Sequence, residues 1–425
     1  MIKEKVLIVL LNINNEHSES QIEYKTNELK ELVKASNAQV DFTVVQNVNN
    51  INPKYFIGKG KAEEVKTICE NHDIDTVIFN HDLSGSQMKN LEDIIDRKIV
   101  DRTGLILDIF ARRAKTKEGK LQVKLAQLEY RLPKLVGFRN YLSKEGAGIG
   151  TRGPGEQKLE IDRRSIQAEI TSIKHKLKNE KLKRDTKRKK RSNANLKSVS
   201  LIGYSNSGKS TILNKLLAKN EKNEKNVYSD DLLFATLDIA SRTIKLDNDK
   251  EMIVSDTVGF ISDLPTKLVE SFKSTLEEIK DSDLLILVID SSNDQYENQI
   301  QATKDVLKEM KIEDKDILYV FNKMDLVKDF VDYNNYENEI YISALDEKGI
   351  ESLLDKIKNI LYADYDYYKV LIPYSRYDEL ISLIPNKIRE KQIYLEDGIE
   401  TYVYINKKDL SLYKEIIKDE WWKKN

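Results

Sequence analysis

Residues 198–210 read Ser-Val-Ser-Leu-Ile-Gly-Tyr-Ser-Asn-Ser-Gly-Lys-Ser, and this stretch decides the fold expected for the middle of the chain. It holds the spacing G-x-x-x-x-G-K-S from Gly203 to Ser210, after an apolar run and before the helix-forming residues 211–218. A strand, a loop and a helix are therefore expected in that order. In such a loop backbone N–H groups surround phosphate oxygens, Lys209 neutralises their charge, and the serine hydroxyl can bind Mg²⁺. The stretch predicts a phosphate-binding loop in an α/β domain.

A second motif selects the base of the nucleotide. Asn322-Lys-Met-Asp325 follows the apolar residues 317–321. A carboxylate at Asp325 can accept hydrogen bonds from the ring N–H and the exocyclic amine of guanine, and adenine has neither donor at those positions. Such a site is expected to reject adenine by a factor of about 10⁴ or more. The alkyl stem of Lys323 could cover the base, and the backbone amides of Ser343-Ala-Leu345 would contact the guanine oxygen.

Two further segments are expected to respond to the γ-phosphate. Asp256-Thr-Val-Gly259 follows an expected strand, so its carboxylate can hold Mg²⁺ through water and its glycine can offer an N–H to the γ-phosphate. Phe234-Ala-Thr-Leu-Asp238 supplies Thr236, the candidate second hydroxyl on Mg²⁺ beside Ser210, from a mobile switch segment. We expect Lys209, Thr236 and Gly259 to act in catalysis.

The predicted nucleotide site thus comes from five segments. It comprises Gly203, Tyr204, Ser205, Asn206, Ser207, Gly208, Lys209, Ser210, Phe234, Ala235, Thr236, Leu237, Asp238, Asp256, Thr257, Val258, Gly259, Asn322, Lys323, Met324, Asp325, Ser343, Ala344 and Leu345. One position departs from the common pattern, because Phe260 stands where many GTPases have a glutamine that orients the attacking water. An aromatic ring cannot polarise water, so slow intrinsic hydrolysis is expected, with a partner completing the site.

The first hundred residues alternate strand-like and helix-like stretches, which predicts a small parallel sheet flanked by helices. The strands are expected at 6–13, 40–48 and 76–79, and the helices at 20–36, 61–72 and 84–97. Gly58-Lys-Gly-Lys61 precedes one of these helices, but no G-x-G-x-x-G is present, so the sequence leaves open whether this domain binds a second nucleotide.

Two long helices are expected next, one over residues 104–133 with Pro133 as its end and one over residues 156–191. Their apolar stripes are Leu121, Leu125, Leu128 and Leu132 in the first, and Leu159, Ile166, Ile170, Ile173 and Leu177 in the second. Each stripe needs an apolar partner, so together they predict a long antiparallel helical hairpin.

Residues 134–155, between these helices, form a loop of 22 residues, although a hairpin needs only about two to eight. The loop holds six of the sixteen glycines of the chain, the cations Lys134, Arg139, Lys144 and Arg152, and the aromatic residues Phe138 and Tyr141. Glycine allows close backbone approach, the cations could contact phosphates and the aromatic rings could stack on unpaired bases, so the loop fits a probe for structured RNA. A linker without a function would explain the glycines but not the cations.

The near-zero net charge of −1 hides a strong asymmetry. Residues 111–191 carry 25 Lys and Arg against 9 Asp and Glu, a net charge of +16, so the remainder carries −17. A basic segment of this kind favours a polyanionic partner, although lysine-rich helices are also common as solvated faces.

The composition limits the class of protein. With 40% hydrophobic and 33% charged residues, the chain is too apolar for global disorder. Its longest strongly apolar run, residues 284–289, is far shorter than the roughly 18 residues of a membrane helix, and we expect no signal peptide. The single Cys69 excludes an intrachain disulfide and a Cys-based zinc cluster. A cytoplasmic protein without a membrane segment is expected.

The ordered motifs GYSNSGKS, FATLD, DTVGF, NKMD and SAL resemble those of translation-factor-class GTPases whose catalytic glutamine is replaced by a hydrophobic residue. The stretches 55–61, 100–113 and 148–156 resemble the HflX family of ribosome-associated GTPases, and the likeness covers about residues 1–362. The resemblance implies Mg²⁺ and GTP, binding to the large ribosomal subunit and GTP-dependent splitting of stalled or idle ribosomes. It also implies that the glycine-rich loop reaches ribosomal RNA near the peptidyl transferase centre, where Arg139, Lys144 and Arg152 would contact phosphates.

The overall expectation is an α/β multidomain protein. Its parts are an N-terminal parallel α/β domain (1–110), a long antiparallel helical hairpin (111–195), a P-loop GTPase α/β domain (196–364) and a small C-terminal α+β domain (365–425). In the last, a strand near 369–373, a helix near 377–390, a hairpin around Asp397-Gly398 and a final helix are expected. A monomer is expected. Two other functions stay open: a GTP-gated ribosome assembly or RNA-binding factor without splitting activity, and a nucleic-acid enzyme acting through the N-terminal domain.

Overall fold

The computed structural model describes most of the chain. The described residues are 3–137, 154–192, 196–219, 233–234, 240–246, 251–257, 259–261, 279–312, 314–327, 336–378, 380, 389–413 and 415–420. They fall into two compact units, and each is described by itself. The first unit holds the described residues up to Lys183 together with Leu233, Phe234 and Ile261, and the second holds the others.

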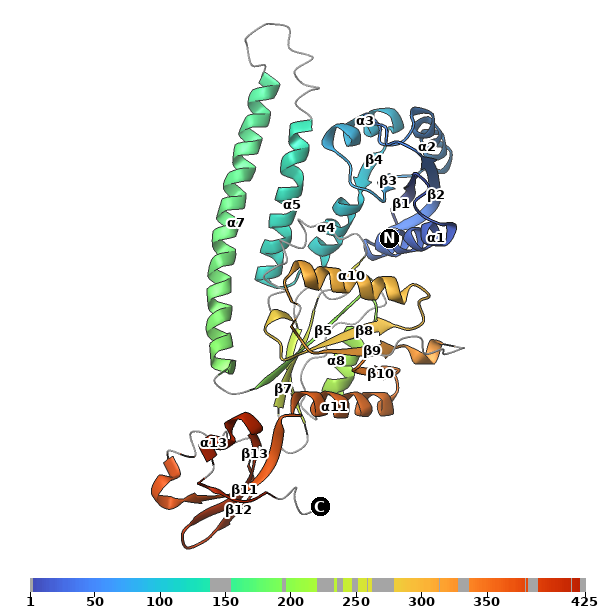
Figure 1. Cartoon of the computed structure of the whole chain (residues 1–425). Helices are drawn as coiled ribbons and strands as arrows, with labels where there is room; N and C mark the ends of the chain where they lie inside the picture. Colours follow the sequence, from blue (N-terminus) through green and yellow to red (C-terminus); the bar gives the residue numbers. More distant parts are fainter. Residues whose placement is uncertain are drawn as a thin grey trace. The chain divides into compact units, whose positions relative to one another are not determined.

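The N-terminal domain is a four-stranded parallel sheet covered by helices, as the sequence predicted (Figure 1). The strand order is β2-β1-β3-β4. Its elements are β1 (Lys5–Ile13), α1 (Glu19–Ala35), β2 (Gln39–Val48), α2 (Lys59–His72), β3 (Thr76–Phe79), α3 (Gly85–Ile95), β4 (Lys98–Asp101) and α4 (Arg102–Arg113). Strand β4 was not predicted, because its four residues follow α3 directly. Ser18 and Ser84 begin α1 and α3 with capping boxes.

The single helix predicted over residues 104–133 is wrong, because the structure has two helices there. Helix α4 ends at Arg113, where Ala114 takes an extended conformation, and α5 runs over Lys117–Gly137. The hydroxyl of Thr116 accepts a hydrogen bond from the N–H of Gly119 at 2.9 Å, which starts the new helix. Helix α5 also continues past Pro133, which was expected to end it.

Helix α7 (Pro154–Ser192) packs against α5, and Figure 1 shows the two side by side. Leu125 and Leu128 of α5 are buried together with Ile170 and Ile173 of α7. Ion pairs Lys117–Glu180, Lys124–Glu169 and Lys174–Glu129 join the helices, which run antiparallel, since the last turn of α5 and the first turn of α7 lie at the same end of the pair in Figure 1. The side chain of Leu159, which belongs to the predicted stripe, lies outside those that the structure describes.

The second unit contains a six-stranded sheet in the order β10-β9-β8-β5-β7-β6, parallel except for the β6–β7 pair. Its elements are β5 (Lys197–Gly203), α8 (Lys209–Ala218), β6 (Ala240–Lys245), β7 (Glu251–Asp256), β8 (Leu284–Asp290), α10 (Tyr296–Glu309), β9 (Ile317–Asn322), η1 (Met324–Leu326), β10 (Glu339–Tyr341) and α11 (Glu347–Leu361). A single apolar core joins strands β5, β7, β8 and β9 to α8 and α11. The carboxyl ends of parallel strands share one edge of the sheet, which is where ligands bind in such folds.

The C-terminal domain is a four-stranded antiparallel sheet in the order β12-β13-β11-β14. Its elements are β11 (Tyr365–Pro373), η2 (Tyr374–Arg376), β12 (Arg389–Tyr394), β13 (Gly398–Asn406), η4 (Lys407–Asp409), α13 (Leu410–Tyr413) and β14 (Ile417–Glu420). The hairpin around Asp397-Gly398 is confirmed by the β12–β13 pairing. The predicted final helix is wrong, since α13 has only four residues and strand β14 follows it. The helix predicted up to residue 390 overlaps β12, and residues 381–388 lie outside the described chain.

Candidate nucleotide site

The loop Gly203–Ser210 connects the end of β5 to the start of α8, and its glycines are required by their surroundings. Gly203 has φ +139°, and a Cβ there would lie 2.2 Å from the carbonyl oxygen of Val288. Gly208 has φ +99°, and a Cβ there would lie 2.2 Å from the Asn322 side-chain nitrogen. Any other residue at either position would be strained and would clash, so the sequence spacing reflects a real steric requirement.

Lys209 begins helix α8 with its side chain turned into the loop. The ammonium group donates to the carbonyl oxygens of Tyr204 at 2.6 Å and Gly203 at 3.1 Å. Burial lowers the pKa of Lys209 to about 8, against the opposing attraction of the Asp256 carboxylate. A positive charge held at a helix N-terminus, where backbone N–H groups converge, favours an anion such as phosphate.

Ser210 and Asp256 bring two hard oxygen donors together. The Ser210 hydroxyl donates to Oδ2 of Asp256 at 2.6 Å, and Asp256 is fully buried at the end of β7. Mg²⁺ prefers carboxylate and hydroxyl oxygens together with phosphate and water. The chemistry of this pair therefore fits the metal that the sequence predicted, although Thr236, the expected second hydroxyl, lies outside the described residues.

The segment after Asp256 is tied to the phosphate loop by its backbone. The N–H of Ser205 donates to the carbonyl of Phe260 at 2.7 Å, and the N–H of Phe260 donates to the carbonyl of Gly203 at 3.1 Å. A Cβ on Gly259 would lie 2.6 Å from Cα of Ser205, so only glycine allows this approach. The Phe260 ring itself is buried, which agrees with its inability to orient water.

Asn322 links the phosphate loop to the segment expected to hold the base. Its side-chain N–H₂ donates to the carbonyl of Ser207 at 2.8 Å, and its side-chain oxygen accepts from the N–H of Ala344 at 2.9 Å. Asn322 is buried, so both hydrogen bonds form away from water. One side chain therefore sets the spacing between the two halves of the site.

Lys323 has a partner that the sequence reasoning missed. Its ammonium group lies 2.8 Å from Oδ2 of Asp290, at the end of β8, and its backbone has φ +63°. The sequence did indicate this partner, because Asp290 follows the apolar run 284–289 in the same way that Asp256 follows the apolar residues of strand β7. The ion pair fixes the direction of the lysine stem.

A pocket of about 600 Å³ opens beside Asp325 and the segment 343–345. Its walls are Met324, Asp325, Tyr341, Ile342, Ser343, Leu345, Asp346 and Gly349. Met324, Asp325, Ser343 and Leu345 belong to the predicted nucleotide site, and the volume lies within the range of small-ligand sites. The pocket holds a carboxylate at one wall and apolar side chains at others, a combination suited to a planar base with hydrogen-bond donors.

Several predicted residues lie outside the described part of the chain, and one described residue lies elsewhere in it. Ala235, Thr236, Leu237, Asp238, Val258, Arg139, Lys144 and Arg152 lie outside the described residues. Phe234 is described and buried in the first unit, with its ring 4.7 Å from that of Phe110 in a T-shaped contact. Among the described residues no helix is long and apolar enough to cross a membrane. That part of the chain also has no cluster of three or more His, Cys, Asp or Glu side chains able to hold a metal ion.

The chain is similar to known GTPase families and proteins. Three family models match: "GTP-binding GTPase N-terminal" over residues 23–111, "GTP-binding GTPase Middle Region" over 113–191 and "50S ribosome-binding GTPase" over 198–323. The chain is 43% identical to "GTPase HflX" of Caldanaerobacter subterraneus over 398 residues, 94% of this chain and 89% of that protein. It is 40% identical to "GTPase HflX" of Escherichia coli over 326 residues, 76% and 75% of the two chains. A GDP complex of a GTP-binding protein from Sulfolobus solfataricus is 25% identical, with a TM-score of 0.45 over 85% of this chain and 99% of that one.

Proposed function

Because the chain belongs to the HflX family of GTPases, we propose that it binds the RNA of the large ribosomal subunit and uses GTP to split stalled or idle ribosomes. GTP hydrolysis to GDP and phosphate is the activity of the family. The ribosome as partner is supported by the family description "50S ribosome-binding GTPase" that matches residues 198–323. The observation that supports its nucleotide part is that Asn322 joins the phosphate loop to the segment proposed to bind the base, at the edge of the sheet.

In the proposed mechanism the chain's own groups bind and orient the nucleotide. Lys209 moves from the carbonyls of Gly203 and Tyr204 to the β- and γ-phosphate oxygens, and the N–H groups of the loop surround the phosphates. Ser210 and Asp256 would hold Mg²⁺, the serine through its hydroxyl and the aspartate through water. When bound, the metal supplies positive charge that stabilises the phosphate oxygens in the transition state.

The base is fixed by a separate set of groups. Asp325 accepts hydrogen bonds from the ring N–H and the amine of guanine, and the N–H groups of residues 343–345 face its oxygen. The stem of Lys323, held by Asp290, covers one face of the ring. The carboxylate and the N–H groups reject adenine, so GTP is the proposed substrate.

Hydrolysis is proposed to be slow without the ribosome. Phe260 is buried and bonded through its backbone to the phosphate loop, so it offers no group to orient water. Thr236 is proposed as a ligand of Mg²⁺ in the triphosphate state only, and Gly259 as the N–H donor to the γ-phosphate. A Thr236→Ala variant should then keep its GDP affinity and lose most of its hydrolysis.

The RNA-binding part is proposed to be the pair of helices and the segment between them. Helix α7 ends in the run Lys187-Arg-Lys-Lys-Arg191, and residues 111–191 carry a net charge of +16. Such a charge attracts an RNA backbone and makes binding sensitive to salt. Arg139, Lys144 and Arg152 are proposed to contact phosphates of the ribosomal RNA. The protein is proposed to act as a monomer in the cytoplasm.

The test combines hydrolysis and splitting. GTP turnover is measured with and without saturating large subunits, and ribosome dissociation is followed by light scattering and sucrose gradients with GTP, GDP or no nucleotide. We expect turnover to rise strongly with the subunit and ribosomes to separate with GTP. Lys209→Ala serves as the inactive control. Stimulated hydrolysis without any separation of subunits would instead support a GTP-gated assembly or RNA-binding factor, and turnover unchanged by ribosomes would contradict both.

A further inference from the structure

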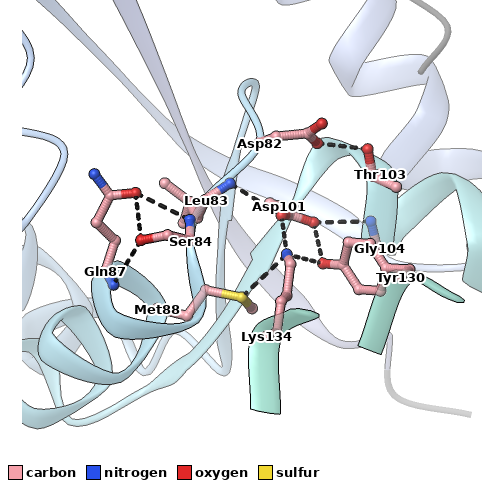
Figure 2. A network of polar contacts seen from close by, with 10 residues as sticks. All are labelled: Asp82, Leu83, Ser84, Gln87, Met88, Asp101, Thr103, Gly104, Tyr130 and Lys134. Atoms are coloured by element: carbon pink, nitrogen blue, oxygen red, sulfur yellow. Dashed lines mark hydrogen bonds and ion pairs between the residues drawn. The ribbon is translucent and has the colours of Figure 1, made fainter. Parts of the chain in front are cut away.

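A fully buried carboxylate at the end of β4 gathers an unusual number of donors (Figure 2). Oδ1 of Asp101 accepts from the N–H of Gly104 at 2.8 Å, which caps helix α4, and Oδ2 accepts from the N–H of Leu83 at 3.1 Å. These two bonds come from the N-terminal domain itself. They already hold Asp101 in one orientation, so further donors must serve another purpose than starting α4.

The further donors come from helix α5, on one face and one turn apart. The hydroxyl of Tyr130 donates to Oδ1 of Asp101, and the ammonium of Lys134 donates to Oδ2. Lys134 also donates to the Tyr130 oxygen at 2.5 Å and lies 3.4 Å from the sulfur of Met88. Burial, with the nearby Asp101 charge, raises the pKa of Tyr130 far above its usual range, so its hydroxyl stays protonated.

A backbone contact reinforces this cluster. Gly85 begins α3, and a Cβ on it would lie 2.2 Å from the carbonyl oxygen of Lys134. The first turn of α3 therefore touches the last turn of α5 with no room for a side chain. Helix α5 continues to Gly137 past Pro133, which cannot donate the usual helical hydrogen bond. Tertiary contacts with the N-terminal domain hold this final turn in place.

The cluster lies just before the segment proposed to contact RNA, and this position indicates its role. Lys134 lies four residues before the start of the segment 138–153, which carries the proposed RNA-contacting cations. A buried ion pair is often no more stabilising than apolar side chains of similar size, whereas it can fix one orientation of the groups it joins. A Lys–Asp pair at the end of α5 is thus better suited to setting direction than to adding stability.

We propose that Asp101, Tyr130 and Lys134 form a positioning cluster, through which the N-terminal domain fixes the direction in which α5 delivers the RNA-contacting segment. Lys134 is then a positioning residue and not an RNA contact, although it belongs to the basic region. This inference rests on the proposed function only for its consequence, ribosome splitting. The positioning itself is a property of the free protein.

The first measurement uses the free protein. Cys69 is buried and its pKa is raised to about 11 by burial, so it reacts slowly and cysteines placed at Glu63 and Ser143 can carry a pair of spin labels. Lys134→Met should broaden the distance distribution between the labels severalfold, and Asp101→Asn should do the same. Arg131→Met removes the same charge from an exposed position on α5, and it should leave the distribution unchanged. Tyr130→Phe is a milder variant in case the others do not fold. An unchanged width in the folded cluster variants would overturn the proposal.

The second measurement uses ribosomes and separates positioning from RNA contact. Lys134→Met should split ribosomes about tenfold more slowly, with the same GTP turnover in the free protein and the same dependence of subunit binding on salt. Arg152→Ala should instead reduce the salt dependence by about one charge. A reduced salt dependence in Lys134→Met would make Lys134 an RNA contact and refute the positioning role. If the intact protein splits no ribosomes, the proposed function fails, and the spin-label distances still decide the positioning role.

Discussion

Replacing Asn322 with alanine tests whether one side chain holds the nucleotide site together. The change leaves the carbonyl of Ser207 and the N–H of Ala344 buried without their partner. A buried polar group without a hydrogen bond costs about 1–3 kcal/mol. Water entering the space left by the side chain would recover part of this, so we take about 1 kcal/mol for each group and about 2 kcal/mol in total. Without Asn322 the free protein no longer holds the two halves at the binding spacing, so GDP binding has to restore that spacing; the cost corresponds to at most a roughly 30-fold loss of GDP affinity.

The assay is a titration of the full-length protein with fluorescent GDP in the presence of Mg²⁺. Asn322→Asp is the sharper variant, because it keeps an acceptor for Ala344 and sets a carboxylate oxygen against the carbonyl of Ser207. We therefore expect it to bind GDP no better than Asn322→Ala. Asn298→Ala, on the exposed face of α10, is the control and should bind GDP normally. Near-native affinity in either Asn322 variant would refute the idea that this side chain organises the site.

Three further predictions concern other groups of the nucleotide site. Asp325→Asn should weaken GTP binding and favour a xanthine nucleotide, because an amide can donate where the carboxylate accepted. Equal affinity of the native protein for labelled GDP and ADP would refute the assignment of Asp325 to guanine recognition. Burial lowers the pKa of Lys209 to about 8 in the free protein, so GDP affinity should fall as the pH rises above 8. Bound phosphates raise that pKa, so GDP binding at pH 8.5 should take up protons. Calorimetry in buffers of different ionisation enthalpy measures this uptake. Asp290→Asn should raise the GDP dissociation constant about 3- to 10-fold by freeing Lys323, a contribution of about 1 kcal/mol; an unchanged constant would show that the ion pair does not orient the lysine.

Local spacing made much of the fold predictable. The phosphate loop and the apolar strands β1, β5 and β9 follow from short-range patterns, because buried strands are apolar and turns need glycine at fixed positions. Gly203 and Gly208 are examples, since their backbone conformations and close contacts admit no side chain. The α4–α5 break could not be read in this way, because the residues around Ala114 have no strong helix-breaking character and the extended conformation is set by the surrounding structure.

Contacts between residues far apart in the sequence could not be predicted either. Asp290 and Lys323 are 33 residues apart, as are Asp101 and Lys134, and no pattern in the sequence pairs them. Lys134 shows that a basic stretch does not reveal what each of its cations contacts. It stands at the start of a basic, glycine-rich stretch, and yet its side chain points into the N-terminal domain (Figure 2). Strand β14 was missed for a similar reason, since its residues pair with β11, far away in the sequence.

The three ion pairs between α5 and α7 bear on the register in which the two helices pack. The apolar seam there consists of leucines and isoleucines of similar size, so a shift of one helix along the other by a turn, about 5.4 Å, would still match apolar side chains. Lys124–Glu169 and Lys174–Glu129 lean in opposite directions along this antiparallel seam, since residue 124 pairs with 169 and the later residue 129 pairs with 174. A shift of one helix in either direction would therefore lengthen one of these two pairs while it shortened the other. Such pairs are individually weak, but their opposite lean favours the observed register over its neighbours on either side. The surface charges therefore help to set how far the helix ends Gly137 and Pro154 lie from one another along the hairpin.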